Sequence, residues 1–205
     1  MLMTPTCLTR RGALVSTIVT PLLALPFAAA AEPAGTVEAL RGEATAQVGS
    51  GIRPLAQNAS VLVGDLVATG AQSAVALRLG SATQVRLGPE ARLRIDRFLV
   101  KVGGILELAN GAMVFDHDPT AGPTEMAVRS PFGLIAVRGT RFFAGPSNGV
   151  FGVFVARGVV LVVGQNRSMQ VEAEFGSDIA AAGMEPTLPH RWAEPRIKAA
   201  MASVM

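Results

Sequence analysis

An eight-residue echo constrains the fold of this chain more than any other feature. Three five-residue runs, starting at Ala76, Gln84 and Arg92, follow one another at intervals of eight residues, and apolar and polar residues alternate in each. Alternation with a period of two is typical of half-buried β-strands, because successive side chains point to opposite faces. Gly-Ser, Gly-Pro and Asp-Arg pairs between the runs provide turns. One face would carry the aliphatic residues Leu77, Leu79, Val85, Leu87, Leu93 and Ile95.

The same pattern continues to about Glu174 and predicts an all-β fold of many short strands. Residues 150–155 and 159–163 differ from the other strands because they are apolar on both faces. Such a strand either lies inside the fold or covers a partner, and we favour burial. The short repeat is compatible with a sandwich and with a short β-solenoid.

The domain organisation follows from the same reading. We expect a leader at 1–31, a linker at 32–35 and one β domain at 36–175. A Pro-containing tail follows at 176–205, where Ile197, Met201 and Val204 have the spacing of a short helix. The roughly 174 residues after the leader can bury roughly 70% of their unfolded surface, which is enough for one core.

The leader has the three parts of a secretory signal peptide. A positive start with Arg10 and Arg11 precedes an uncharged, largely apolar stretch at 12–31 that ends in four alanines. We therefore expect cleavage near Ala31 and a periplasmic location. An uncleaved leader is the alternative, since about 20 uncharged residues can just span a bilayer, and it would be the only membrane contact.

The export route stays open. The pair Arg10-Arg11 resembles a twin-arginine signal. Ala13 and Val15, however, lie near the places where that signal has Phe and a trailing Lys.

Composition excludes several classes of function. Subtracting the two arginines of the leader from the 18 basic residues leaves 16 against 15 acidic residues, a net charge of +1. Nucleic-acid binding needs a clustered basic surface, so we expect none. The only cysteine, Cys7, lies in the leader, and no Gly-x-Ser-x-Gly elbow or Gly-rich phosphate loop occurs. We therefore predict no enzyme activity and no cofactor.

Asp116-His117-Asp118 is the one cluster with metal-binding or acid–base character. Neighbouring residues on a strand point to opposite faces, so His117 cannot join both aspartates at one site without a turn. A metal site needs three or four converging ligands, and the second histidine, His190, lies far along in the tail. We interpret the cluster as a hydrophilic loop and expect no metal site.

Several short motifs occur in a characteristic order. They are Gly35-Thr36-Val37, Arg41-Gly42-Glu43-Ala44, VGDLVATG at 63–70, VRSP at 128–131, VRGTRF at 137–142 and VFVARGV at 153–159. Together they resemble the FecR domain family, known as the periplasmic sensory domain of iron-siderophore signal transducers. The resemblance covers about residues 35–174. Its specificity comes from the order, spacing and strand context of the motifs.

The resemblance implies a non-enzymatic module that receives or relays a signal by contact with another envelope protein. Transducers of this family carry a cytoplasmic anti-sigma region before a membrane span, and residues 1–11 are too few to form one. We therefore expect a stand-alone FecR-like module without its own anti-sigma region. A cell-wall or glycan-binding module is the alternative. Sugar binding favours exposed aromatic platforms, whereas this chain has no Tyr and a single Trp, Trp192.

The motif residues also have a structural interpretation. A glycine at 64 can take a positive φ, and the carboxylate of Asp65 can cap backbone N–H groups. The pair at 69–70 would end the following strand, and the pair at 139–140 would form a turn or bulge. We expect structural roles, and no ligand contact, for Gly64, Asp65, Thr69, Gly70, Gly139 and Thr140.

Two further sets of residues are candidates for a partner surface. If the three repeats lie side by side, Arg78, Arg86 and Arg94 form a ladder that could meet an acidic partner or an anionic glycan. A solvated outer face is the interpretation we favour for them. The apolar strands around Phe151 and Phe154 are the second candidate, as a dock for a protein partner. The oligomeric state stays open at this point.

Overall fold

The structure is a computed structural model that describes residues 32–99, 103–122 and 125–205, all within one compact unit of the chain. These residues form one sheet of 16 strands and one α-helix near the C-terminus. The predictions of an all-β fold and of a short C-terminal helix are therefore confirmed. No helix in the described ranges combines the length and apolar character needed to cross a membrane.

The strands have the following bounds: β1 (Pro33–Arg41), β2 (Ala44–Val48), β3 (Gly51–Pro54), β4 (Ser60–Leu62), β5 (Leu66–Thr69), β6 (Ala74–Leu79), β7 (Thr83–Leu87), β8 (Arg92–Leu99), β9 (Gly103–Asn110), β10 (Met113–His117), β11 (Glu125–Ser130), β12 (Gly133–Ser147), β13 (Val150–Val163), β14 (Ser168–Glu172), β15 (Phe175–Ile179) and β16 (His190–Arg191). The helix α1 spans Glu194–Ala202, and a 3-10 turn, η1, spans Pro119–Ala121.

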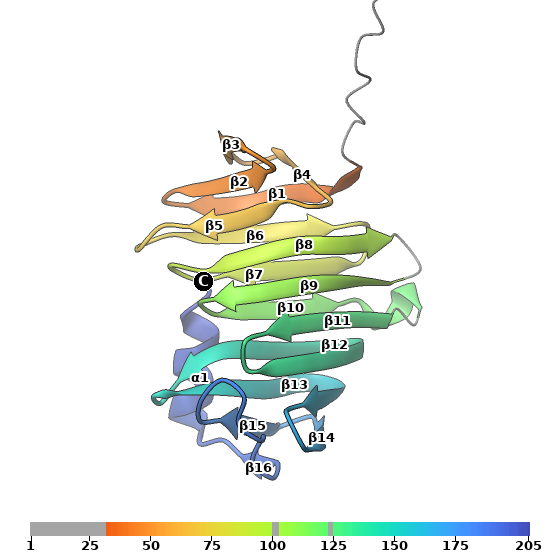
Figure 1. The fold of residues 1–205 in the computed structure, drawn as a ribbon, viewed down its shortest axis with the longest axis vertical. Helices are drawn as coiled ribbons and strands as arrows, with labels where there is room; N and C mark the ends of the chain where they lie inside the picture. The colour runs from red at the N-terminus through yellow and green to blue at the C-terminus, as the bar shows by residue number, and fades with distance from the viewer. Residues whose placement is uncertain (1–31, 100–102, 123–124) are drawn as a thin grey trace, which may run out of the picture. The chain divides into compact units, whose positions relative to one another are not determined.

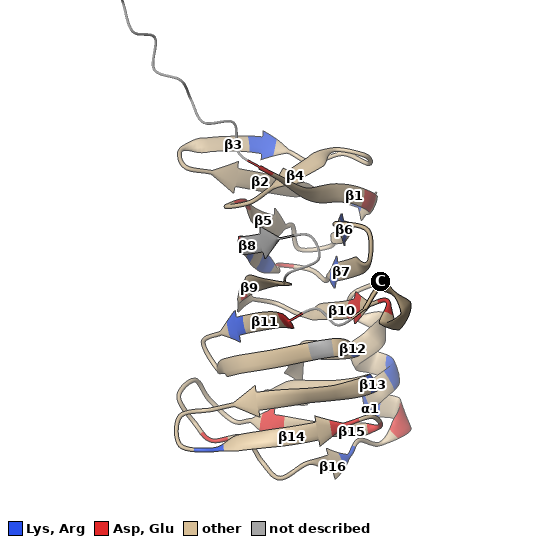
Figure 2. Cartoon of the chain, turned by 90° about the vertical axis from the view of Figure 1, so that its right-hand side faces the viewer, with Lys and Arg blue, Asp and Glu red and all other residues tan. Residues whose placement is uncertain are grey.

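The sheet folds back on itself into two layers (Figures 1 and 2). The first layer holds β3, β2, β5, β8, β9 and β11 in that order, and the second holds β4, β1, β6, β7 and β10. Strand β12 joins them, because its first half pairs with β11 and its second half with β10. Among the described strands only β9 and β11 pair in parallel. This arrangement is a sandwich closed at one side, and it differs from the parallel stacking of a β-solenoid.

The corner between the layers is made by β12 and β13 together. These strands pair along most of their length, with register shifts around Arg138 and Arg141. Of the turn and the bulge that the sequence allows at Gly139 and Thr140, the structure has the bulge, and β12 continues through it as a single bent strand. Such a bend lets one strand change layer while the pairing continues on either side of it.

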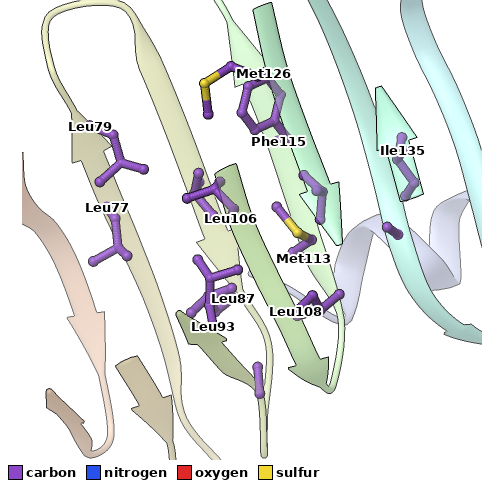
Figure 3. Packing of buried hydrophobic residues seen from close by; sticks show 14 of the residues in the cluster. Leu77, Leu79, Leu87, Leu93, Leu106, Leu108, Met113, Phe115, Met126 and Ile135 are labelled. Atoms are coloured by element: carbon purple, nitrogen blue, oxygen red, sulfur yellow. The ribbon is translucent and has the colours of Figure 1, made fainter. Parts of the chain in front are cut away.

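The core lies between the two layers. All six aliphatic residues of the eight-residue echo are fully buried there, as predicted. Aromatic residues from neighbouring strands join them, with Phe115 on β10 stacked 5.4 Å from Phe142 on β12 between ring centroids. Figure 3 shows how the leucines, Met113 and Phe115 from both layers meet in this space. The alternating pattern therefore encodes the two inner faces of the sandwich.

A second, smaller cluster covers the outer face of the second layer. Outward side chains of β10, β12 and β13 pack under Trp192 and α1, and the buried residues are Ala112, Val114, Phe143, Phe154, Trp192, Ala200 and Val204. The guanidinium of Arg196 lies over the Trp192 ring at 3.6 Å from its centroid. The same group donates hydrogen bonds of 2.7 and 2.9 Å to Asp178, which holds the tail against β15.

Candidate protein-binding surface

A shallow apolar groove crosses the outer face of the first layer where β9, β11, β12 and β13 lie side by side. Its volume is about 910 Å³. Ala127 and Ala136 lie between the larger side chains of Ile105 and Leu161, and Gly103 belongs to the lining as well. We refer to this feature as the apolar groove.

The strand register explains why the groove forms. Ile105 pairs with Ala127, Ala127 with Ala136, and Ala136 with Leu161, so these four residues form one row across four strands. Side chains in such a row point to the same face of the sheet. Two small residues between two large ones leave a trough.

The groove leaves apolar side chains in solvent. Val159 and Leu161 on β13 are 41% and 42% exposed. The same strands have apolar outer faces in the second layer, where Phe143 and Phe154 are covered by Trp192 and α1. Apolar surface rimmed by polar residues is typical of interaction sites, so the apolar groove is our candidate for a binding surface in the described part of the chain.

Opposite charges lie on either side of the groove floor. On β11, Glu125 precedes Ala127 by two residues and Arg129 follows it by two, and both charged residues are exposed. Figure 2 shows the two charges at opposite ends of β11. The nearest carboxylate oxygen of Asp96 is 4.0 Å from Arg129, which makes this a weak surface ion pair.

The arginine ladder does not form. Arg78 and Arg86 lie on the neighbouring strands β6 and β7 of the second layer, but Arg94 lies on β8 of the first. Each repeat buries its aliphatic face, so arginines from different layers point away from each other. Arg78 contacts Glu38, and Arg94 contacts Glu107 at 3.6 Å. The echo marks strands that face the core, and only the first two of its three strands are neighbours.

The two candidate phenylalanines are buried in the fold. Phe151 is 5% exposed and stacks on Phe132 with ring centroids 4.4 Å apart, and Phe154 lies 5.4 Å from Trp192. Neither offers a surface to a partner in this structure. The interpretation of burial therefore holds on both faces for 150–155, but it is wrong for the outer face of 159–163. Sequence reasoning treated the two halves of β13 alike because nothing local distinguishes the half that α1 and Trp192 cover.

The Gly64-Asp65 motif has the predicted geometry. Gly64 has a φ of 90°, and the buried Asp65 carboxylate accepts a 2.7 Å hydrogen bond from the Leu62 N–H. It also accepts two hydrogen bonds, of 2.9 and 2.5 Å, from the guanidinium of Arg53. The hydrogen bonds to Asp65 raise the pKa of Arg53. Sequence reasoning missed Arg53 as the partner of Asp65. The two residues are 12 positions apart, and Arg53 comes near Asp65 only because β3 pairs with β2.

The other two motif pairs are also structural. Strand β5 ends at Thr69, whose hydroxyl donates to the Gly88 carbonyl at 2.7 Å and accepts from the Ala91 N–H at 2.9 Å. This hydroxyl therefore ties β5 to the crossing between β7 and β8. Gly139 has a φ of 62° and, with Thr140, forms the bulge at the corner of β12.

The Asp116-His117-Asp118 cluster is not a loop, which corrects the sequence interpretation. Asp116 and His117 end β10 and point to opposite faces, while Asp118 caps η1. His117 is 3% exposed, with its Nδ1 2.9 Å from the Thr83 hydroxyl. Asp116 accepts a 2.8 Å hydrogen bond from Arg157. In the ranges that the structure describes, no three His, Cys, Asp or Glu residues gather as metal ligands.

These observations define a class of protein: an all-β sandwich with a bent two-strand corner, whose candidate site is an apolar surface. Residues 65–161 match the family model described as FecR protein. The resemblance inferred from the motifs is confirmed over this range, which is narrower than the 35–174 expected.

Two solved structures share the fold. Both are crystal structures of "a putative anti-sigma factor" from Parabacteroides distasonis, with 16% identity and a TM-score of 0.54. Each match covers 65% of this chain, and 63% or 62% of the length of the neighbour. A comparison with curated proteins gives no match.

Proposed function

We propose that this protein is a non-enzymatic, periplasmic module of envelope signalling that works by binding another protein through the apolar groove. The groove carries the proposal, because it leaves Val159 and Leu161 exposed beside the small residues Ala127 and Ala136. The FecR domain gives the signalling context. The export-type leader supports the periplasmic location.

The surface chemistry favours a protein ligand over a glycan. Apolar contacts dominate the groove, and protein interfaces are built around such desolvated patches. Trp192, the one tryptophan that could offer a sugar platform, is 5% exposed and lies under the guanidinium of Arg196. No observation on the described residues supports the glycan-binding alternative.

Site-directed photocrosslinking in cells tests the proposal. A photoreactive residue replaces Leu161 in the groove, and in a matched variant it replaces Ile52, which is 67% exposed on the distant edge strand β3. We expect crosslinks to an envelope protein, or to the protein itself, from position 161 only. Fractionation of the same cells should place the protein in the periplasm.

A functional readout complements the crosslinks. Leu161→Asp should abolish the transcriptional response that is lost on deleting the gene, whereas Ile52→Asp should preserve it. Equal crosslinking from both positions, a cytosolic location, or a normal response from Leu161→Asp would contradict the proposal.

A further inference from the structure

We propose that residues 180–205 form a strap that detaches from the sheet as one unit, at a lower free-energy cost than unfolding of the whole domain. While it is docked, the strap covers an apolar face on the outer side of β10, β12 and β13. This face is separate from the apolar groove, so its release does not depend on the proposed function.

The strap lies outside the core between the two layers. Among the described residues, the last one that belongs to this core is Ile179, at the end of β15. The buried strap residues Trp192, Ala200 and Val204 all belong to the smaller outer cluster. The strap can therefore leave while the inner faces of both layers stay packed. Elements attached through few buried contacts open locally at a lower cost than the core.

Trp192 rests on a seat made by two glycines. A Cβ on Gly152 would stand 2.5 Å from the nearest indole atom, and a Cβ on Gly176 would stand 2.2 Å from it, both closer than real contacts allow. Gly152 lies on β13 and Gly176 on the neighbouring strand β15. The indole ring therefore packs directly on the backbone of two strands, with the Phe154 ring 5.4 Å away between centroids.

One carboxylate fastens the strap to β15. Asp178 accepts both hydrogen bonds of the Arg196 fork, and the two side chains are 17% and 12% exposed. The Nε of Arg196 also donates to the Ser147 hydroxyl at 3.0 Å. An arginine fork on a carboxylate is strong and directional. Because the same guanidinium lies over the Trp192 ring, loss of either contact weakens the other.

Two features lower the stability of the docked state. The Nε1 of Trp192 is buried and has no hydrogen-bond partner in the part of the molecule that the structure describes, and water would satisfy it once the strap opens. Helix α1 has nine residues and follows Ala193, whose methyl side chain cannot cap it. So short a helix is unstable away from the sheet. Undocking and unfolding of α1 should therefore occur in one step.

Opening uncovers a hidden apolar face. The outward side chains of Val114, Phe143 and Phe154 lose their cover when Trp192 and α1 leave. Exposed apolar surface of this kind is typical of interaction sites. The docked strap is therefore an autoinhibitory contact, because a partner reaches this face only in the open state.

Hydrogen exchange of the full chain in increasing urea, read by mass spectrometry, tests the strap. In the wild type, the amides of α1 should exchange through an opening that is cheaper and less urea-dependent than the opening that exposes β6 and β7. These two strands report the core, because Leu77, Leu79, Val85 and Leu87 are fully buried there.

A pair of glycine variants tests the seat of Trp192. Gly152→Ala pushes the indole away without changing the strap, and it should speed the exchange of α1 amides at least about tenfold. The amides of β6 and β7 should change less than about twofold. Gly51→Ala is the matched control, since its nearest neighbour would be an ordinary 3.6 Å contact. It should leave exchange in α1 unchanged.

The latch offers a second, independent variant. Arg196→Gln removes the fork to Asp178 and should speed exchange in α1 by a similar factor. If Gly152→Ala does not fold, Arg196→Gln decides by the same comparison. The strap is refuted if the wild-type α1 amides exchange with the same free energy and urea dependence as those of β6 and β7. Equal acceleration of α1 and the core strands in the deciding variant refutes it as well.

Discussion

The Cγ2 methyl of Thr140 on β12 lies directly over the α-carbon of Gly158 on β13. A Cβ on Gly158 would stand 2.6 Å from this methyl, closer than real contacts allow. Gly158 also has a φ of +83°, in the left-handed region that favours glycine. Both residues belong to the corner where the hairpin passes between the layers. The close packing at the bend therefore requires a glycine at position 158, opposite Thr140.

Two glycine-to-alanine variants should separate strain from crowding at this corner. Gly139 has a φ of +62° with open space around its α-carbon, so Gly139→Ala should cost about 1 kcal/mol of unfolding free energy. Gly158→Ala adds the overlap with Thr140 and should cost about 3 kcal/mol. Urea unfolding measures both, and adding Thr140→Ser should recover part of the larger loss. Equal costs for the two variants would show that the contact is unimportant.

The hydroxyl of Thr140 is predicted to be dispensable. The side chain is fully buried, and its Oγ1 has no hydrogen-bond partner in the described part of the molecule. Thr140→Val keeps the methyl over Gly158 and removes an unsatisfied polar atom, so it should leave stability unchanged or raise it by up to about 1 kcal/mol. Thr140→Ala loses packing and should lower it. A clear loss for the valine variant would reveal a partner for the hydroxyl.

The Arg53–Asp65 pair should matter more than any exposed ion pair. The Asp65 carboxylate is fully buried, whereas the Arg53 side chain is 35% exposed. Arg53→Ala leaves the carboxylate without its main partner and should cost about 2 kcal/mol, below the range for fully buried pairs because Arg53 is partly solvated. Arg191→Ala is the control, since Arg191 and Glu174 are both 69% exposed. We expect less than about 0.5 kcal/mol there, and similar costs for the two variants would refute the distinction.

Glu38 should make stability depend on acid pH. Burial raises the pKa of Glu38, but hydrogen bonds from Gln84 and Arg78 outweigh it, so the pKa lies below its ordinary value of 4.5. A carboxylate with a lowered folded-state pKa stabilises the fold above the unfolded pKa, and this contribution is lost as the pH falls through the folded pKa. Compared with Glu38→Gln, the wild type should gain about 0.5 kcal/mol near pH 6 and nothing near pH 2. Urea unfolding at both pH values provides the measurement, and a difference that does not change with pH contradicts the expectation.

The candidate site could not be read from the chain order alone. Ile105, Ala127, Ala136 and Leu161 come from four strands, and the pairing of β9 with β11 is parallel while the others are antiparallel. The stretch at 159–163, which is apolar on both faces, was a sequence signal for this site. The outer face of 159–163 is exposed, whereas Trp192 and α1 cover the outer face of 150–155 on the same strand, β13.

Local patterns along the chain predicted which residues alternate, which face is apolar, where Gly64 turns and where Asp65 caps a backbone N–H. Periodicity and turn chemistry act over a few residues, so they can be read without the fold. The choice of neighbouring strands became visible in the folded molecule alone. The fold placed Arg94 in a different layer from Arg78 and Arg86, buried Phe154 under the tail and brought Ala127 beside Ala136. Strand order results from contacts between distant segments, and the same two-residue pattern is compatible with many such orders.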